Sequence, residues 1–443
     1  MRILLVQAYL GRKEKPIYPI GLATLASVLK NHDLKVIDPN ILEEPEADLK
    51  RIAREFQPEI IGISLRNVDT TQVRDPFIYY NGMRESLSAV KAVCPDAGIV
   101  IGGSGFSIYA REIMLAVPEI QVGVYLEAEA TFPELVEKFP DIENVKGIFY
   151  RKADEIIFTG KRDFPQTTDI PSPDYDRVSI APYKDLLDAV GIQTKRGCAL
   201  CCAYCNYPML NGKNYRFRNP VKVVDDIERL VKEFGLERFI FVDSVFNIPR
   251  GHAEAVMNEL LDRNLDIKWT GWFNERALDR EFVELALKAG CEFFSFSPDG
   301  YSNKSLKALG KNLRTKDIHR VYKIMKDYPQ ALVGYNFFLN PPGQTVFSLL
   351  RLLIFAFKVK LTFGSRSLGL LLGSIRIEPD TPIYERALKE GFITENTPML
   401  VETSLELEEL FYKPPHSLML SLMLKLYIFV RKLKHRIRSP REL

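Results

Sequence analysis

The stretch KRGCALCCAYCNYP, residues 195–208, contains four of the chain's six cysteines. They form two CxxC pairs, Cys198 with Cys201 and Cys202 with Cys205, and no residue separates the pairs. Zinc sites built from two CxxC pairs need a spacer so that four sulfurs can surround one ion, which makes zinc the weaker alternative. The spacing CxxxCxxC omits Cys201 and would leave one iron of a cubane cluster without a protein ligand. The cysteines could instead form a redox-active CxxC pair or serve as buried structural residues.

The cysteines follow the first of six apolar, strand-like segments in the second half of the chain. These segments alternate with helical patterns and cover residues 189–197, 238–246, 267–273, 292–300, 332–340 and 368–379. Six βα units predict a partial (β/α)6 barrel, whose chemistry lies at the C-terminal ends of its strands. The apolar run 346–363 is interrupted by Arg351, Lys358 and Lys360, so we expect it to be a helix of this barrel.

The first 140 residues show a similar alternation. Continuous apolar runs at 2–8, 34–38, 60–65, 98–103 and 121–125 alternate with helix candidates at 20–31, 46–56, 81–93 and 107–116. Continuous apolar runs are typical of buried parallel strands, so the sequence predicts an α/β domain with a doubly wound parallel sheet. The expected domains are residues 1–140, a hairpin and proline-rich linker at 141–188, the barrel at 189–395, and a short C-terminal helical segment with a basic tail at 396–443.

Composition limits the class of protein. Apolar residues make up 46% and charged residues 26% of the chain, as in a globular enzyme. Six cysteines are too few for a disulfide scaffold, and the N-terminus has no signal-peptide pattern, so we expect a cytoplasmic protein. Residues 416–443 carry seven Lys or Arg and one acid, which leaves 53 basic and 56 acidic residues in the first 415. The body of the chain is therefore not predicted to bind nucleic acid.

The cysteine motif resembles that of the radical S-adenosylmethionine (SAM) superfamily: CxxxCxxC with an aromatic residue, Tyr204, before the last cysteine, at the first strand of a partial barrel. In that family three cysteines hold a 4Fe-4S cluster, SAM chelates the open iron, and one electron cleaves SAM to a 5′-deoxyadenosyl radical. The resemblance implies Cys198, Cys202 and Cys205 as metal ligands, Tyr204 beside the adenine, and Cys201 as the spare thiol. It also implies a one-electron reductant such as flavodoxin or ferredoxin.

The same resemblance indicates further contacts to SAM at two strand ends. FVDSVFN, residues 241–247, lies where the superfamily often contacts the methionine amino group, so Asp243 or Ser244 is expected to do so. At the fourth barrel strand, Ser297 and Asp299 in FSPDG take the place of the usual acidic ribose contact.

Four segments before the barrel resemble, in order, the cobalamin-binding domain of class B radical SAM enzymes. They are YPIGLATLASVL at 18–29, GISLRN at 62–67, IGGSGFS at 101–107 and EAEATFPEL at 127–135. The resemblance implies that cobalamin rests on the loops at these strand ends, although the glycines could alternatively serve only as tight turns. The implied cobalamin contacts are Ser64, Arg66, Gly102, Gly103, Ser104 and Glu127.

One loop departs from the pattern of that domain. Many cobalamin domains carry DxHxxG after the first strand, and its histidine ligates cobalt, whereas the loop QAYLGRKEKP at 7–16 contains no histidine. His32 is the domain's only histidine, and we expect it at the surface. The sequence is most similar to the branch that includes cobalamin-dependent tryptophan methyltransferase, in which an arginine approaches the lower face of cobalt. Arg66 is the candidate for that position, and the alternative is that Arg66 solvates a loop.

The resemblance implies that the enzyme is a carbon methyltransferase. A methyl group would move from SAM through methylcobalamin to a carbon of a small-molecule substrate, lipid-like or aromatic, by a radical or a polar route. The first alternative is oxidative cyclisation or rearrangement without methyl transfer, as in porphyrin-ring cyclase relatives. The second is a cobalamin-binding carrier or sensor with a structural cluster.

The segment HSLMLSLMLKLYIFVRKLKHRIR, residues 416–438, is the last feature of the sequence. Its apolar part is too short to span a bilayer, and the pattern predicts a buried or interfacial helix. We expect it to pack across the barrel mouth or, alternatively, to make peripheral contact with a membrane.

Overall fold

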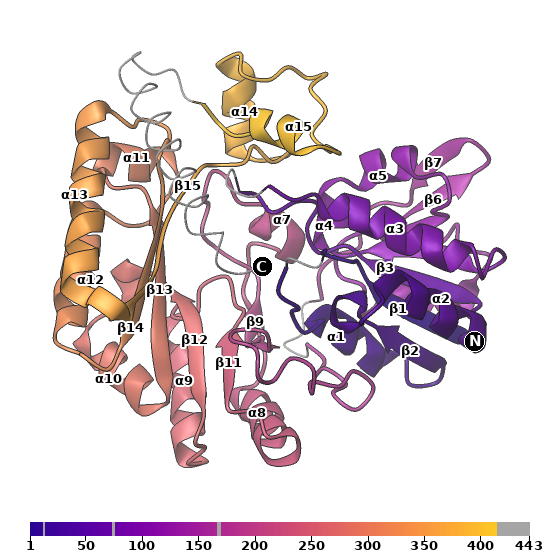
Figure 1. The fold of residues 1–443 in the computed structure, drawn as a ribbon, viewed down its shortest axis with the longest axis horizontal. Helices are drawn as coiled ribbons and strands as arrows, with labels where there is room; N and C mark the ends of the chain where they lie inside the picture. The colour runs from indigo at the N-terminus through magenta and orange to yellow at the C-terminus, as the bar shows by residue number, and fades with distance from the viewer. Residues whose placement is uncertain (12–13, 73–75, 166–169, 414–443) are drawn as a thin grey trace.

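The N-terminal domain is built on a seven-stranded sheet (Figure 1), seen in a computed structural model that describes residues 1–11, 14–72, 76–165 and 170–413. In spatial order the strands are β2 (Asp33–Ile37), β1 (Arg2–Gln7), β3 (Ile60–Ser64), β4 (Gly98–Gly102), β5 (Val122–Val124), β6 (Ile148–Lys152) and β7 (Glu155–Phe158). The first five are parallel, and β6 and β7 extend the sheet as an antiparallel hairpin. The strand order reverses between β1 and β3, and sheets of this type bind ligands where such a reversal occurs.

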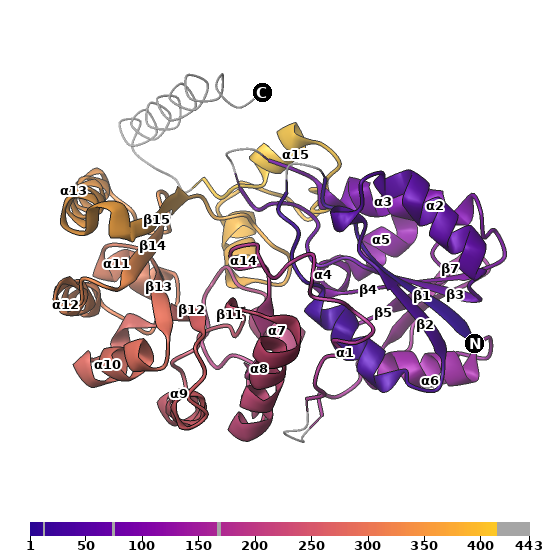
Figure 2. The ribbon, with the colours of Figure 1, turned by 60° about the horizontal axis from the view of Figure 1, so that its bottom comes forward.

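Helices cover both faces of this sheet (Figure 2), as a doubly wound domain requires. One face carries α1 (Ile20–Val28) and α6 (Thr131–Lys138), and the other carries α2 (Pro45–Phe56), α3 (Tyr79–Lys91) and α5 (Ala110–Ala116). The helix predicted at 107–116 is two helices, because α4 (Ser104–Ile108) ends at Tyr109, whose backbone leaves the helical region. The 3-10 turn η1 (Pro39–Ile41) follows β2.

The second domain is a partial barrel of six parallel strands. Their order is β8 (Gly191–Ile192), β11 (Arg238–Phe241), β12 (Lys268–Phe273), β13 (Cys291–Asp299), β14 (Leu332–Phe338) and β15 (Ser367–Gly373). The main helices beside them are α8 (Pro220–Phe234), α9 (Arg250–Asp262), α10 (Arg280–Lys288), α12 (Thr315–Lys326) and α13 (Val346–Phe363). Shorter elements at the strand ends are α7 (Tyr207–Asn211), η2 (Glu275–Ala277), α11 (Asn303–Ala308) and η3 (Gly364–Arg366). The predicted fold class, a doubly wound domain followed by a partial barrel, is confirmed.

The first predicted barrel strand, 189–197, is interrupted. Only β8 pairs with the barrel sheet, whereas β9 (Lys195–Arg196) turns away and pairs antiparallel with β10 (Arg216–Phe217). The break lies directly before the cysteines, so the cysteine segment starts outside the barrel sheet.

After β15 the chain returns to the N-terminal domain. Residues of the segment 375–412, which includes α14 (Pro382–Lys389) and α15 (Ser404–Glu409), share a hydrophobic core with α2, α3 and α5. Arg376 is buried and pairs with Asp69 at 3.0 Å and with Glu378 at 3.5 Å. The sequence assigns residues up to 395 to the barrel domain, and the structure shows that residues of the segment 375–412 pack in the core of the first domain. The helix predicted at 416–438 lies outside the described residues.

Candidate functional site

The cysteine segment is held by close backbone contacts on both sides. Gly197 has a φ of +89°, and a Cβ there would lie 2.0 Å from the carbonyl oxygen of Asn214. Gly310 has a φ of +66°, and its Cβ would lie 2.2 Å from the carbonyl oxygen of Cys201. Because no larger side chain fits at either glycine, the two contacts fix the path of the cysteine segment.

The four thiols of this segment have different surroundings. Cys198 is buried, Cys202 and Cys205 are half-buried, and Cys201 is exposed. The pKa of Cys205 is raised to about 11, mainly by burial and in smaller part by the charges of Cys202 and Cys198, so these three thiols lie within electrostatic range of one another. The backbone N–H of Tyr207 donates to Cys205 Sγ at 3.4 Å. Cys201 Sγ faces a carbonyl of its own loop, that of Ala199, at 3.8 Å.

This donor set fits an iron–sulfur cluster better than a single metal ion. In the described part of the chain, no group of three or more His, Cys, Asp or Glu side chains is arranged to hold one ion. A cubane cluster binds each thiolate to a different iron, so its ligands need not converge on one point. Soft thiolates on one loop suit such a cluster.

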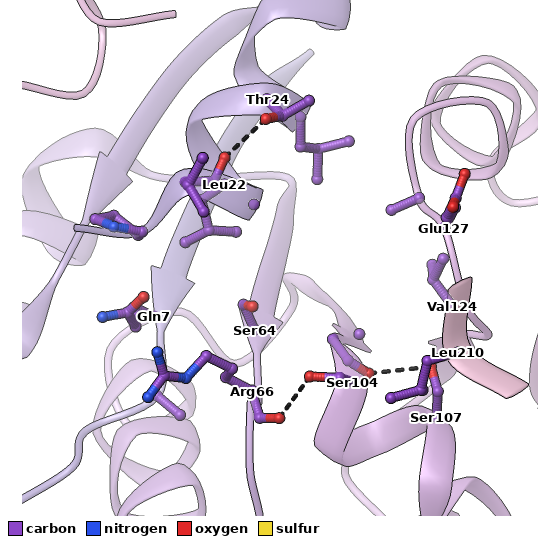
Figure 3. Close-up of a pocket in the computed structure, with 18 of the residues that line it drawn as sticks. Gln7, Leu22, Thr24, Ser64, Arg66, Ser104, Ser107, Val124, Glu127 and Leu210 are labelled. Atoms are coloured by element: carbon purple, nitrogen blue, oxygen red, sulfur yellow. Dashed lines mark hydrogen bonds between the residues drawn. The ribbon is translucent and has the colours of Figure 1, made fainter. Parts of the chain in front are cut away.

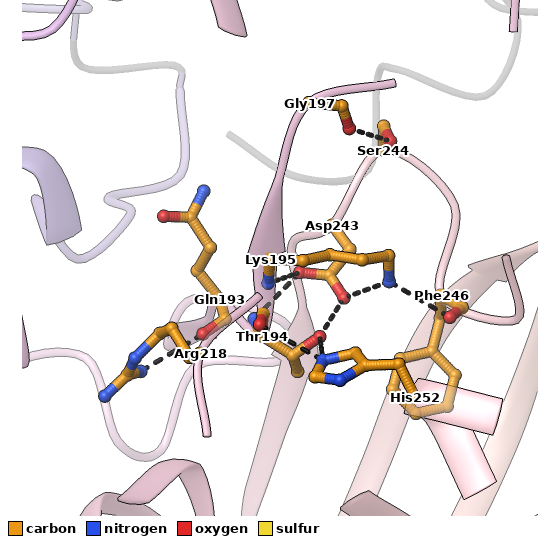
Figure 4. Close-up of polar contacts among 9 residues, drawn as sticks. All are labelled: Gln193, Thr194, Lys195, Gly197, Arg218, Asp243, Ser244, Phe246 and His252. Carbon is orange, nitrogen blue, oxygen red and sulfur yellow. Dashed lines mark hydrogen bonds and ion pairs between the residues drawn. The ribbon is translucent and has the colours of Figure 1, made fainter. Parts of the chain in front are cut away.

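A buried ion pair lies at the start of the cysteine segment, where Lys195 precedes Cys198 by three residues (Figure 4). Lys195 Nζ contacts the Asp243 carboxylate at 2.7 Å, and both side chains are at most 1% exposed. Asp243 also accepts from the backbone N–H groups of Thr194 and Lys195, at 2.8 and 3.2 Å, and from the Thr194 hydroxyl at 2.5 Å. His252 Nε2 completes the group, 3.1 Å from Thr194 Oγ1.

These contacts bear on the predicted SAM residues at the end of β11. A carboxylate offers about four acceptor positions, and Asp243 already accepts four hydrogen bonds. No acceptor is left for an amino group, so Asp243 acts here by positioning the start of the cysteine segment. Ser244 is half-buried, and its hydroxyl makes a long contact of 3.4 Å to the Gly197 carbonyl, so it is the remaining candidate of the two.

The other predicted SAM residues meet around a lysine. The Tyr204 hydroxyl donates to Asp299, and Lys311 Nζ pairs with Asp299 at 2.5 Å. Lys311 also donates to the Ser297 carbonyl at 2.8 Å, while Asn336 donates to the Ser297 hydroxyl at 3.0 Å. Burial alone would lower the pKa of Lys311, but the Asp299 carboxylate holds it well above its usual value. No sequence motif marks Lys311 as part of this site.

A cavity of about 570 Å³ lies between the two domains (Figure 3). All of the predicted cobalamin contacts line it: Ser64, Arg66, Gly102, Gly103, Ser104 and Glu127. The barrel contributes Gln193, Arg196, Tyr207, Leu210 and Val242, among others. Strand ends of the first domain thus face the cysteine-bearing region of the second across one space.

The loops after β3 and β4 are locked together at this cavity. The Ser104 hydroxyl donates to the Arg66 carbonyl at 2.6 Å (Figure 3). Gly103 has a φ of +99°, and a Cβ there would lie 2.5 Å from the Leu65 carbonyl oxygen, so this position requires glycine. A Cβ at Gly102 would meet nothing closer than 3.7 Å, so the neighbouring glycine is not required by these contacts.

Arg66 brings a positive charge to the cavity. Its side chain is exposed to this space, where partial desolvation by the cavity walls lowers its pKa while Tyr79 and Glu14 oppose that shift. No carboxylate of the described residues lies within ion-pair distance of its guanidinium. Among the described residues that line the cavity there is no histidine. His32 is half-buried in the turn before β2 and lies elsewhere.

A cluster of charges joins the two domains at the edge of the cavity. Arg216 donates to Glu127 at 2.9 Å, and Arg196 pairs with Glu127 at 3.3 Å and with Glu129 at 2.5 Å. Burial alone would raise the pKa of Glu129, but the Arg196 guanidinium holds it below its ordinary value. Glu127 is therefore engaged in holding the domains together. No sequence motif marks either arginine as part of this cluster, because only the pairing of β9 with β10 brings them together.

Comparison with known proteins agrees with this division of the chain. Residues 7–136 match the B12-binding domain, and residues 192–353 match the radical SAM superfamily. An uncharacterised methyltransferase of Pyrococcus horikoshii is 24% identical over 85% of this chain and 79% of its own length. An anaerobic magnesium-protoporphyrin IX monomethyl ester cyclase of Cereibacter sphaeroides is 26% identical over 70% of this chain, which spans about half (51%) of that relative.

A solved structure has the same fold. It is the radical SAM methyltransferase TsrM of Kitasatospora setae with cobalamin and a 4Fe-4S cluster bound, with a TM-score of 0.76 and 21% identity. The match covers 89% of this chain and 79% of that one. Two matched domains in this order, and the shared fold, confirm the family predicted from the cysteine motif and the four loop segments. The chain belongs to the radical SAM proteins that carry an N-terminal B12-binding domain.

Proposed function

We propose that this protein is a cobalamin-dependent radical SAM enzyme that transfers a methyl group from SAM, through methylcobalamin, to a carbon of a small-molecule substrate. One observation carries the proposal: a single cavity is lined both by the strand ends of the B12-binding domain and by Tyr207 and Leu210, which closely follow the cysteines. A methyl carrier and a SAM-binding centre would therefore face the same space.

The relatives favour methyl transfer over cyclisation. The chain spans 79% of the Pyrococcus methyltransferase but only 51% of the Cereibacter cyclase. The cyclase contains about as much sequence again, so its activity is the weaker guide. Cyclisation or rearrangement without methyl transfer is the second candidate, supported by the 26% identity to that cyclase.

The residues around the cysteines would hold the cofactors as follows. Cys198, Cys202 and Cys205 ligate the 4Fe-4S cluster, and Tyr204 and Ser244 contact SAM. When bound, the cluster and SAM supply radical chemistry and cobalamin carries the methyl group. The chain's own task is to hold these groups in place.

Two polar networks help to hold the cofactors in place. The Lys195–Asp243 pair fixes the start of the cysteine segment, and Lys311 orients Asp299 and the Ser297 carbonyl where SAM is expected. A one-electron reductant would serve the radical chemistry. The proposed substrate is a small molecule of either the lipid-like or the aromatic class.

The proposed cobalamin contacts are Arg66 and four further residues, Ser64, Gly102, Gly103 and Ser104. We expect wild-type protein to bind cobalamin without a nitrogen ligand from the protein, because the described residues that line the cavity include the Arg66 cation and no histidine. Electron paramagnetic resonance of the cobalt(II) form should show no nitrogen splitting from a lower ligand. The Arg66→His variant should gain that splitting, whereas Arg66→Gln should not. Nitrogen splitting in the wild type would contradict the proposed role of Arg66.

The test of the function uses protein purified from cobalamin-fed cells and reconstituted with iron and sulfide. It is incubated with a reductant, SAM labelled in its methyl group, and a small-molecule extract or candidate substrates. We expect the label in a product, formed together with S-adenosylhomocysteine. Protein prepared without cobalamin is the control and should transfer no label. Production of 5′-deoxyadenosine with an unlabelled product would reject methyl transfer and favour the second candidate, and absence of bound corrin would reject the cobalamin assignment.

A further inference from the structure

The helix α13 has an exposed apolar face. Phe347, Leu350, Ile354, Phe357 and Leu361 are 43% to 69% exposed. Their spacing of three and four residues places them along one side of the helix. The opposite side packs in the barrel core through Leu349, Leu352, Phe355 and Val359, so the apolar composition of α13 serves two surfaces.

Nothing in the described part of the chain covers this face. Figures 1 and 2 show α13 at the outer edge of the barrel, on the side away from the B12-binding domain. A continuous row of large exposed apolar side chains on a protein surface marks a binding surface.

The charges of α13 itself all have one sign. Arg351, Lys358 and Lys360 are exposed, and α13 contains no acidic residue. At about 100° per residue, Arg351 and Lys358 flank one side of the apolar row and Lys360 flanks the other. None of these three cations has an ion-pair partner among the residues that the structure describes. The face is therefore an apolar stripe between unpaired positive charges.

This charge pattern indicates which kind of partner binds the exposed face of α13. A second copy of the chain docked through the same face would bring three cations against three cations. The chain's own residues 416–443 carry seven Lys or Arg against one acid, so they too would bring like charge. An anionic lipid surface offers negative headgroups to the flanking cations and a hydrocarbon boundary to the apolar stripe.

We propose that α13 is a docking helix that lies in the plane of an anionic membrane surface, with its apolar stripe inserted. In the part of the chain that the structure describes, no helix is long and apolar enough to cross a membrane, and α13 itself carries three charges. This contact is distinct from one made by the C-terminal segment. It also leaves the cavity between the domains open, because α13 lies on the far side of the barrel (Figure 2).

Vesicle binding of the full chain tests this inference. The probes are vesicles of phosphatidylcholine alone and of phosphatidylcholine mixed with phosphatidylglycerol, and the readout is the fraction of protein that floats with them. Binding is expected only to the mixed vesicles and should weaken as salt rises. Ile354→Ser with Phe357→Ser should reduce the partition coefficient at least about tenfold, since two apolar side chains no longer insert. Arg351→Glu with Lys358→Glu should also reduce it at least about tenfold.

Control variants show whether a loss of vesicle binding is specific to α13. Leu115→Ser, at a residue of α5 that is 62% exposed, should bind vesicles like the wild type. Because every substituted side chain is exposed, all variants should fold, which circular dichroism verifies. Wild-type binding by both α13 variants would overturn the proposal, as would loss of all binding in a chain that ends at Lys413. A dimer that Ile354→Ser dissociates would assign the face to self-association instead.

Discussion

The Cys202→Ala variant is expected to retain only background iron after anaerobic reconstitution, whereas Cys201→Ala should retain as much iron and sulfide as the wild type. Cys202 lies within electrostatic range of Cys198 and Cys205, and Cys201 is exposed and faces its own loop. A cluster with three protein ligands cannot lose one without losing most of its affinity. Iron and sulfide analysis per chain, together with the visible absorption of the cluster, measures the difference.

The paired design separates a lost ligand from a damaged fold. Both substitutions remove one thiol from the same loop, so a general loss of stability would lower iron in both variants, and apo-protein unfolding temperatures give an independent check. Full iron in Cys202→Ala with loss in Cys201→Ala would show that the ligand register is wrong. Loss in both at unchanged stability would indicate a site that uses all four cysteines.

The Asp243→Asn variant is expected to lose about 3–5 kcal/mol of unfolding free energy. The Lys195 side chain is 1% exposed, so its ammonium group would remain buried without its counter-ion. An amide also faces that ammonium with a donor where the carboxylate accepted. The chain's two tryptophans, Trp269 and Trp272, both lie in β12 of the barrel, so fluorescence during urea unfolding of the apo protein reports on this domain.

Two further variants show whether the loss comes from the unpaired charge. Lys195→Met combined with Asp243→Leu removes both charges and should recover part of the lost stability. Ser244→Ala should leave the unfolding transition unchanged and weaken only the binding of SAM. A change of less than about 1 kcal/mol in Asp243→Asn would mean that the pair is solvated, contrary to its burial.

The order of the strands along the chain could be predicted from the sequence because it follows from apolar patterning. Buried parallel strands need continuous apolar runs, and the runs at 60–65 and 98–103 become β3 and β4 nearly residue for residue. The loops at the ends of such strands share one edge of the sheet. Ser64 and Ser104 therefore come together at the cavity as the motif order implied.

The hydrogen-bond and ion-pair partners of individual side chains could not be predicted in the same way. The sequence marks Asp243 as an acid at a strand end but does not reveal that Thr194 and Lys195 use all of its acceptors. Lys311 is distant in sequence from Tyr204, and no spacing rule connects them. Partners of this kind depend on which strands bend out of the sheet, as β9 does.

The packing of residues 375–412 could not be predicted from the sequence for a related reason. Ile375 and Ile383 are apolar, but local patterning does not say which of two cores receives them. The structure places both with α2 and α3 of the first domain. The ion pair between Arg376 and Asp69 joins positions 307 residues apart, beyond the reach of local patterning.

The return of the chain after β15 gives the molecule two covalent crossings between its domains instead of one. The first runs through residues 159–190 and the second through the residues after Gly373, which the buried Arg376 anchors on the far side. The two tethers add a covalent restraint to the ion pairs of Arg196 with Glu127 and Glu129 and to the packing of α1 against the barrel core. Any opening that admits a large planar ligand must therefore bend both tethers at once.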